Sequence, residues 1–411
     1  MAYKITILIP NYNRVDALAR LLASTFASIE KANAAEMCSV LVVDDFSSDD
    51  LSKIVEKYSH HPNFKFLLQD KKCGNAETAF LTSLHHVQSE YFWLLGNDDQ
   101  ISIDGVGHVL SLIADSNLGF ILLNPRINKE KIAQSFVPLH TTSPTVYYER
   151  GRDLFYDFGF VTSTTTFPCL LGKTAPVVDY HRLHDLNKFA TVYSHTFTLF
   201  GAFKDLPALF VSTPIVSFTL NERKEEFHKL LKQAPAGIAF YHQSLGLIRL
   251  IREAARTTEI SIAEIGSALE DEVDKDKMQV YPTSLAYFVG FFFLEQLCRE
   301  QHNVMYPRPE FGHLVRSETN EIMGIIESFG DIDLHDACSK ALAAFNWQTP
   351  PASWKLHFLR LTQSKLRELA HLRGQDNTVI DPKDRPLKIA TGNYHALKLR
   401  GVQSTNDGRP L

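Results

Sequence analysis

The sequence predicts an α/β protein with a mostly parallel sheet and crossover helices, followed by an α-helical C-terminal module. Two observations support this fold class. Over residues 1–125, short apolar runs alternate with segments of helical periodicity, and from residue 221 onward the periodicity is helical alone. We therefore expect three parts, residues 1–220, 221–346 and 347–411. The last part combines a basic amphipathic helix with a polar tail.

The alternation of strands and helices begins at the N-terminus. Residues 5–9 form a nearly continuous apolar run that stops at Pro10, as expected for a strand covered on both faces. Apolar residues then recur at helical spacing over residues 17–29, with Asp16 in the first turn. The same alternation predicts further strands at residues 40–43, 65–68, 91–95, 120–123 and 209–212, and further helices at residues 51–58, 76–87 and 106–114.

Composition excludes some classes of protein. The chain has 411 residues, 45% of them hydrophobic and 22% charged, which is enough for two or three ordinary globular domains. Its formal charge of −5 provides no overall basic field, so we expect no nucleic acid as a partner. The five cysteines form no C-x-x-C pair and favour a reducing cytoplasm. The longest apolar stretch, residues 285–294, is about half a membrane span, so no transmembrane helix is expected.

Polar clusters follow three of the predicted strands directly, at residues 10–14, 44–45 and 97–99. Ligands of open α/β sheets bind beyond the carboxyl ends of the strands, where these loops converge. Adjacent carboxylates such as Asp98 and Asp99 repel each other and keep a large solvation demand, which indicates a cation nearby. A solvated turn would explain one such string. Three clusters in register favour a binding site.

These clusters carry a resemblance to a known family. The matching motifs are residues 7–14, 42–49, 74–75 and 93–99, in order and with fitting spacing. Together they resemble the family 2 glycosyltransferases of the GT-A fold, of the kind that build bacterial surface glycans. The resemblance implies a metal-dependent, inverting hexosyl- or N-acetylhexosaminyltransferase. Its donor would be a nucleotide sugar, with a UDP-sugar expected, and its acceptor a hydroxyl of a glycan or a lipid-linked molecule.

The resemblance assigns roles on the donor side. Asp99 would bind Mn²⁺ or Mg²⁺, hard cations that need only one or two protein carboxylates when phosphate oxygens complete the shell. Asp98 would lie nearer the ribose or the sugar. Asn97 stands where a strict D-x-D motif has its first acid. Asp45 is similar to the acid that receives the base N–H of uridine, and Tyr12 to the aromatic beside that base.

The remaining predicted nucleotide-binding residues are Pro10, Asn13, Asp44, Lys71 and Lys72. The Pro10 backbone would form the floor of the pocket, and the two lysines follow the third strand, where a cation can reach phosphate. Structural alternatives stay open. One of the two acids at 44–45 can be a helix-capping or Asx-turn acid, Tyr12 can pack on a helix, and the lysines can be solvated surface residues.

The acceptor side departs from the family pattern. Many inverting members carry a Glu-Asp pair at the start of a helix that here would begin near residues 193–195, counting back from the strand at 209–212. No acid is there, and His195 occupies roughly the position of the base. It can act as the base, as a metal ligand or as a structural histidine. Asp179 and Asp185 are the alternative bases. A zinc site formed by His195 with His181 and His184 is disfavoured, because these lack the usual ligand set.

Two further segments have two interpretations each. Residues 158–165 would form the wall at the acceptor and donor sugar by the family pattern, whereas their composition favours an ordinary Thr-rich strand. Residues 354–373 carry five basic residues and one acidic residue, a net charge of +4. They can dock on a membrane surface or pack on the helical module, and that module can mediate homo-oligomerisation.

Two other functions remain as alternatives. A sugar nucleotidyltransferase needs a Gly-rich basic loop after the first strand, and residues 10–14 contain no glycine. A catalytically degenerate domain that serves as a scaffold or binds glycans would explain the missing Glu-Asp pair. The presence of Asp45 and Asp99 argues against it.

Overall fold

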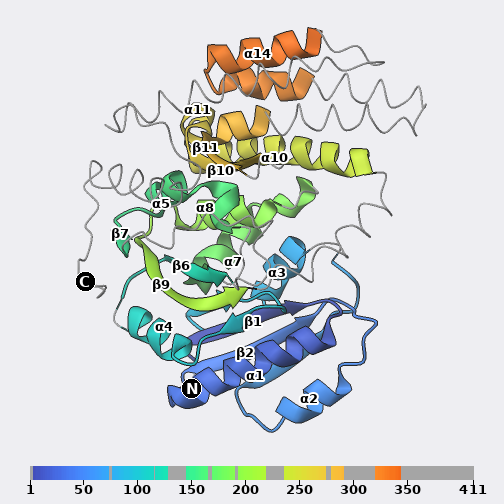
Figure 1. Cartoon of the computed structure of the whole chain (residues 1–411), viewed down its shortest axis with the longest axis vertical. Coiled ribbons are helices and arrows are strands. Elements are labelled where there is room, and N and C mark those ends of the chain that lie inside the picture. Colours follow the sequence, from blue (N-terminus) through green and yellow to red (C-terminus); the bar gives the residue numbers. More distant parts are fainter. Residues whose placement is uncertain are drawn as a thin grey trace.

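The computed structural model describes residues 3–73, 76–114, 116–127, 145–164, 169–189, 193–218, 236–274, 279–290 and 320–343. A nine-stranded sheet runs through the N-terminal part, with helices on both faces. Further helices and a strand pair are stacked beyond one helical layer, with α14 (Ile332–Ala343) farthest from the sheet (Figure 1). The predicted fold class is confirmed.

One half of the sheet is parallel. It contains β1 (Ile5–Asn11), β2 (Cys38–Asp44), β3 (Phe64–Leu68) and β4 (Tyr91–Leu94), in the order β3-β2-β1-β4. These are four of the predicted strands, with small differences at their ends. Asn11 lies opposite Asp44, and Asp44 lies opposite Leu68. The loops after β1, β2 and β3 therefore leave the sheet at one level.

The other half is mixed. Its central strands are β8 (Leu170–Lys173), β6 (Phe120–Ile127) and β9 (Ala208–Phe218), and its short strands are β5 (Gln100–Ile101) and β7 (Val146–Tyr148). β8 pairs antiparallel with both β4 and β6, and β9 pairs parallel with β6. Because β4 and β6 are both antiparallel to β8, they run in the same direction, and β9 runs in that direction too. Their carboxyl ends thus lie at the same edge as those of β1 and β2.

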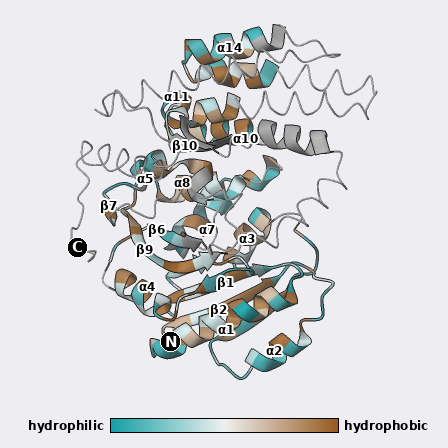
Figure 2. Cartoon of the chain, in the orientation of Figure 1, coloured by the Kyte–Doolittle hydropathy of each residue, from teal (hydrophilic) through white to brown (hydrophobic). Residues whose placement is uncertain are grey.

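Helices cover both faces of this sheet (Figure 1). One layer holds α1 (Val15–Lys31), α2 (Ser52–Tyr58) and α4 (Gly105–Ile113). The other holds α3 (Ala76–Leu84), α5 (Gly151–Phe158), α6 (Phe160–Thr164), α7 (Thr174–Leu183), the 3₁₀ turn η3 (Leu186–Phe189) and α8 (Ser194–Phe203). The helices pack on the sheet through their apolar faces. In α1, for example, the buried leucines Leu18, Leu21 and Leu22 form a single apolar stripe. Figure 2 shows hydrophobic residues concentrated on the strands between the layers.

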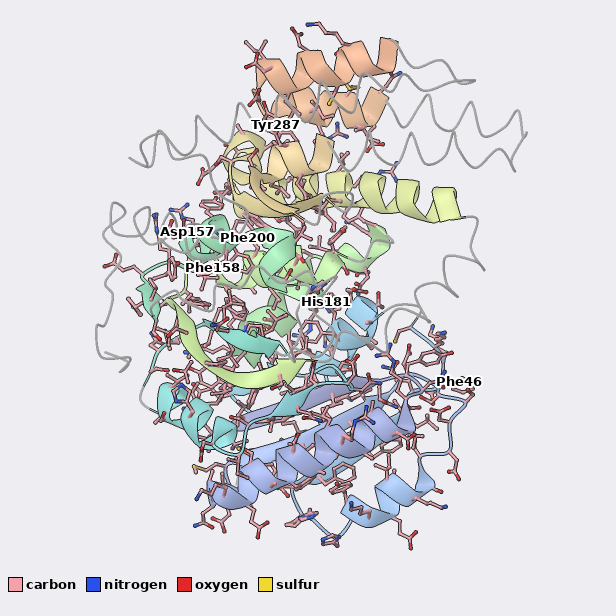
Figure 3. The ribbon with its side chains drawn as sticks, in the orientation of Figure 1. Phe46, Asp157, Phe158, His181, Phe200 and Tyr287 are labelled. Atoms are coloured by element: carbon pink, nitrogen blue, oxygen red, sulfur yellow. The ribbon has the colours of Figure 1, made fainter. Side chains whose placement is uncertain are left out.

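Aromatic rings fix the second layer to the sheet. Phe120 of β6 stacks on Phe155 of α5 at 5.4 Å and on Phe203 of α8 at 5.2 Å between ring centroids. Phe160 of α6 meets Phe200 of α8, which is labelled in Figure 3, at 4.7 Å between ring centroids. All five rings are completely buried. Such pairs add about 0.5–1.5 kcal/mol each beyond the area that they bury, so α6 and α8 hold fixed positions.

Residues 160–164 form the helix α6, so the expectation of a Thr-rich strand there is wrong. The propensity of threonine for strands is weak. Here it is overridden by tertiary packing, since Phe160 enters the aromatic cluster. Thr164 shows how the helix accommodates the residue type, because its hydroxyl donates to the Phe160 carbonyl at 2.6 Å.

The C-terminal region contains α10 (Ala236–Thr258), α11 (Ile262–Gly266) and α14, as the helical periodicity predicts. Between α11 and α14 lies an antiparallel pair, β10 (Leu269–Asp274) and β11 (Gln279–Ser284), which the sequence did not predict. Acidic residues dominate β10, and they are poor strand formers, so no strand signal was present. The predicted basic helix at 354–373 lies outside the described residues. Among those that are described, no helix has the length and apolar character needed to cross a membrane.

Candidate active site

One hydrogen-bond network joins the ends of β1, β2 and β4. Asn11 donates to Asp44 Oδ1 at 2.7 Å, and Asn97 donates to Asn11 Oδ1 at 2.8 Å. Asp44 also accepts from the backbone N–H of Ser47 at 2.9 Å and from its hydroxyl at 2.6 Å. The Asp44 carboxylate thus holds its own turn and the neighbouring strand end together, as an Asx-turn acid does. The three predicted polar loops do converge.

Asp45 lies beside a different segment. Its backbone N–H donates to the Asn11 carbonyl at 2.7 Å, and its Oδ1 accepts the backbone N–H of Cys73 at 2.6 Å. Burial, together with the Asp45 carboxylate, raises the pKa of the Cys73 thiol to about 11. Asp45 is itself only 4% exposed. The loop after β3 is thereby held against the end of β2.

Tyr12 lies at the same edge and is 40% exposed. The Lys72 ammonium lies 3.8 Å from the centre of its ring, whereas Lys71 is exposed. Pro10 is half-buried and lies opposite Val43 of β2. A partly exposed aromatic ring and the ammonium group over it thus lie at the same edge as the buried Asp45.

Asp98 and Asp99 are both nearly fully buried, at 5% and 2% exposure. Asp98 forms an ion pair with Arg14 at 2.9 Å, and Asp99 accepts the backbone N–H of Gly96 at 2.6 Å. Burial raises the pKa of the Cys169 thiol well above its usual range, and the Asp99 carboxylate adds to this. Cys169 directly precedes β8, so this strand also borders the site.

The carboxylates at this edge fit a divalent ion whose other ligands are phosphate oxygens of a bound substrate. Among the described residues, no three His, Cys, Asp or Glu side chains are grouped closely enough to form a metal centre. Asp99 is a buried carboxylate at the end of a strand, and one or two such ligands suffice for Mg²⁺ when phosphates supply the rest. Asp99 would therefore hold such an ion together with the phosphate oxygens.

His195 lies in the first turn of α8, which begins at Ser194 as predicted. The side chain is buried, and its Nε2 lies 2.9 Å from the carbonyl oxygen of Thr164 at the end of α6. A carbonyl only accepts, so Nε2 donates this hydrogen bond, and the neutral tautomer with its proton on Nε2 has its lone pair on Nδ1. α8 leads directly into the start of β9, and its N-terminal end therefore points toward the edge where Asp99 lies.

Asp179 and Asp185 lie on the surface. Asp179 pairs with Arg182 at 3.4 Å, and Asp185 lies 3.9 Å from His181. The helix α7 that carries Asp179 begins where the N–H of Thr174 donates to the Glu90 carbonyl, at the edge where β4 starts. This is the opposite edge of the sheet from Asp99.

The three histidines considered for zinc have separate surroundings. His181 contacts His85 at 3.1 Å, just past the end of α3 (Figure 3). The His184 ring packs on Tyr180 at 4.7 Å, and His195 contacts Thr164. Each ring is thus engaged with a different element.

Sequence reasoning missed some members of this site. Asn11 and Arg14 belong to the recognised motif at 10–14, but nothing in a linear pattern indicates that they contact Asp44 and Asp98. Cys169 has no signal at all, because its proximity to Asp99 depends on the antiparallel placement of β8.

Comparisons with known proteins match part of the chain to a family and agree with the fold. Residues 6–169 match the model of Glycosyl transferase family 2. No curated protein matches the sequence. The chain is similar to the crystal structure of S. aureus TarS 1-349 in complex with UDP-GlcNAc, at 15% identity and a TM-score of 0.52, covering 89% of this chain and 92% of that one.

Two other structures are more distant. TarS 1-349 in complex with UDP has 14% identity and a TM-score of 0.48, over 92% of this chain and 95% of that one. The mannosyltransferase PcManGT from Pyrobaculum calidifontis, in complex with GDP-Man and Mn²⁺, has 12% identity and a TM-score of 0.40, over 80% and 86%. The likeness to the UDP-GlcNAc complex establishes the fold, and the family match establishes the enzyme class. Residues 6–169 therefore carry a family 2 glycosyltransferase domain of the GT-A fold.

Proposed function

We propose that this glycosyltransferase is metal-dependent and inverting, and that it moves a hexosyl or N-acetylhexosaminyl group from a UDP-sugar to a hydroxyl of a glycan or glycoconjugate. The observation that carries the proposal is the network at the ends of β1, β2 and β4, which gathers Asp45, Asp98 and Asp99 at one edge. A nucleoside diphosphate needs such a combination of base acceptor, ribose acceptor and metal carboxylate.

The base would bind between Asp45 and Tyr12. The Asp45 carboxylate would accept the N–H of uracil, and the exposed Tyr12 ring would lie against the base. Lys72 now covers this ring, a contact worth about 0.5–1 kcal/mol at an exposed site. An arriving nucleotide can therefore displace Lys72, which then reaches the phosphates together with Lys71. Asp44 would act by holding the loops rather than by touching the nucleotide.

The leaving group is UDP, on which negative charge accumulates as the glycosidic bond breaks. A divalent ion held by Asp99 and the diphosphate would neutralise this charge. Asp98 would face the ribose or the sugar. We propose Mn²⁺ or Mg²⁺ because these ions prefer carboxylate and phosphate oxygens.

His195 is the proposed base. Its Nδ1 would take the proton of the acceptor hydroxyl while the acceptor oxygen bonds to the anomeric carbon and UDP leaves with its bonding electrons. A single displacement of this kind inverts the anomeric configuration. Asp179 and Asp185 are less suitable, since both are exposed, and the helix α7 that carries Asp179 also starts at the other edge of the sheet. A metal-ligand role for His195 is an alternative for the same nitrogen.

The proposed setting is the cytoplasm, at the inner face of the membrane if the acceptor is lipid-linked. The described cysteines, Cys38, Cys73, Cys169 and Cys338, are free thiols, as a reducing compartment favours. The C-terminal helices would mediate any homo-oligomer, and residues 354–373 would provide the peripheral membrane contact.

A thermal-shift panel tests the proposal. UDP, GDP, ADP and UTP are each added with and without Mn²⁺, and UDP is expected to raise the unfolding midpoint selectively and only with the metal. Ligand at 100 times its Kd stabilises by about 2.7 kcal/mol. No shift with any nucleotide would favour a glycan-binding scaffold. A separate activity assay tests the nucleotidyltransferase alternative, which would be favoured if the protein released diphosphate from UTP and a sugar 1-phosphate.

A further inference from the structure

We propose that Arg14 is a positioning residue that fixes the Asp98 carboxylate for binding of the nucleotide sugar. This inference rests on the proposed function of the site. The Arg14 guanidinium lies 2.9 Å from Asp98 Oδ2, and the Asp98 side chain is only 3% exposed. Arg14 is itself mostly buried, with 19% of its side chain exposed. The ion pair therefore lies within the site and not on its rim.

The backbone is strained to deliver Arg14 to this position. Asn13 and Arg14 both have positive φ angles, 56° and 64°. The left-handed conformation costs roughly 1–2 kcal/mol for residues other than glycine, although asparagine tolerates it better. Two such residues in succession, one of them an arginine, need compensation elsewhere. Strain of this kind clusters at active sites and ligand-binding sites.

The compensation comes from the loop after β2. The N–H of Asn13 donates to Ser47 Oγ at 2.7 Å, and the N–H of Ser48 donates to Asn13 Oδ1 at 2.9 Å. The N–H of Val15 donates to Asp49 Oδ2 at 3.2 Å. These bonds cross between two loops, so the left-handed turn is determined by the neighbouring strand end. From this turn the side chain of Arg14 reaches Asp98.

Charge explains why the pair is useful. Asp98 and Asp99 are adjacent and both buried, and a buried carboxylate without a cationic partner is costly. Arg14 supplies a positive charge to Asp98, while Asp99 accepts from the Gly96 N–H. The two acids are thereby differentiated. Asp98 becomes a fixed hydrogen-bond acceptor for the sugar nucleotide, and Asp99 is the acid assigned to the metal.

Titration calorimetry of UDP and UDP-GlcNAc in the presence of Mn²⁺ tests the role. Arg14→Met, which removes the charge and keeps the length, should weaken binding by about 10- to 100-fold, the usual effect of losing a group that orients a ligand-binding residue. Arg14→Lys should restore part of the affinity, because it keeps the charge without the planar fork. Equal affinity for Arg14→Met and the wild type would overturn the proposal.

Arg14→Gly separates the ion pair from the loop. Glycine adopts positive φ without strain, so this variant should have a higher unfolding midpoint than Arg14→Met, which lacks the same charge beside Asp98. If Arg14 positions Asp98, Arg14→Gly still loses about 10- to 100-fold in affinity. If Arg14 served only the shape of the loop, this variant would bind as the wild type does. It also serves as the folded test protein should Arg14→Met fail to fold.

A double-mutant cycle with Asp98→Asn identifies the partner. Arg14→Met in the Asp98→Asn background should change the affinity by less than about twofold, within the range in which independent effects add. A full loss in that background would show that Arg14 acts through another group. The two hypotheses fail differently. If the wild type binds no UDP with Mn²⁺, the proposed function fails, whereas a binding wild type with additive variants contradicts only the role of Arg14.

Discussion

The proposed donor edge and the proposed acceptor side of this molecule are built differently. At the donor edge, side chains such as Asn11, Asp44 and Asn97 bond to one another across strands that lie side by side. On the acceptor side, His195 is placed by a helix whose position depends on packed rings such as Phe200 and Phe203. A polar network specifies the position of each atom, whereas an aromatic cluster specifies the position of a helix. We therefore expect substitutions at the donor edge to act on binding of the nucleotide and its metal, with a loss of turnover where the metal carboxylate is removed, and those on the acceptor side to act on turnover alone.

The largest effect is expected at Asp99. Asp99→Asn keeps the shape and removes the charge that would hold the metal. Turnover should fall by about 10²- to 10³-fold, the usual effect of losing a group that stabilises charge in the transition state. The measurement is the initial rate of UDP release at saturating Mn²⁺, together with the Mn²⁺ concentration that gives half-maximal rate. Normal turnover with an unchanged requirement for Mn²⁺ would remove Asp99 from the metal site.

His195 is the corresponding test on the acceptor side. His195→Ala should lower turnover at least about a hundredfold with binding of the sugar nucleotide intact, as expected for loss of a general base. The matched control is His195→Gln, whose amide N–H can still donate to the Thr164 carbonyl but which has no basic nitrogen.

The two variants distinguish the roles of His195. If His195 is the base, the glutamine variant is as inactive as the alanine variant. Recovery of turnover by glutamine would show that the contact with Thr164 is what matters and that His195 is structural.

A smaller effect is expected at Gly96. A Cβ added there would lie 2.8 Å from Asp99 Oδ2, so Gly96→Ala must displace this carboxylate. We expect about a tenfold loss in apparent Mn²⁺ affinity, at the lower end for groups that orient a metal ligand. Gly107→Ala in α4 is the control, because its Cβ would meet Ala32 at an ordinary 3.5 Å. Equal Mn²⁺ affinity in both variants would contradict the placement of Asp99.

The smallest effect concerns pH and involves neither region directly. Burial lowers the pKa of His85 below the usual 6.5, with Arg182 and His86 adding to this. Burial also lowers the pKa of His181, with His85 adding, although Asp185 opposes the change. The folded protein thus resists protonation that the unfolded chain accepts. The contribution of these two histidines to the free energy of unfolding is therefore fully present above pH 6.5, and it is lost as the pH falls toward their lowered pKa values.

The measurement is the unfolding midpoint between pH 8 and pH 5. The double variant His85→Gln with His181→Gln should lose less stability over this interval than the wild type. An equal decline in both proteins would show that the histidine pair does not contribute. The effect should be modest, because His85 is exposed.

The sequence was sufficient where the placement of a residue follows from its position along a strand. Asp45 follows β2 directly and Asp99 lies a few residues after β4, and the ends of parallel strands meet at one edge, so their placement at this edge could be expected. The start of α8 near His195 was also predicted, by counting back from β9. The sequence was insufficient at residues 160–164, where the strand propensity of threonine predicted a strand and the structure has the helix α6.

What the sequence determined by itself is the order of strands and helices and the acids that end the strands, because both are encoded locally, in periodicity and in the abrupt change from apolar to charged residues. Only the tertiary structure decided how these acids differ. It paired Asp98 with Arg14, engaged Asp44 with Asn11 and turned His195 toward Thr164. Such pairings depend on backbone angles and on contacts between distant segments, and no linear pattern records them.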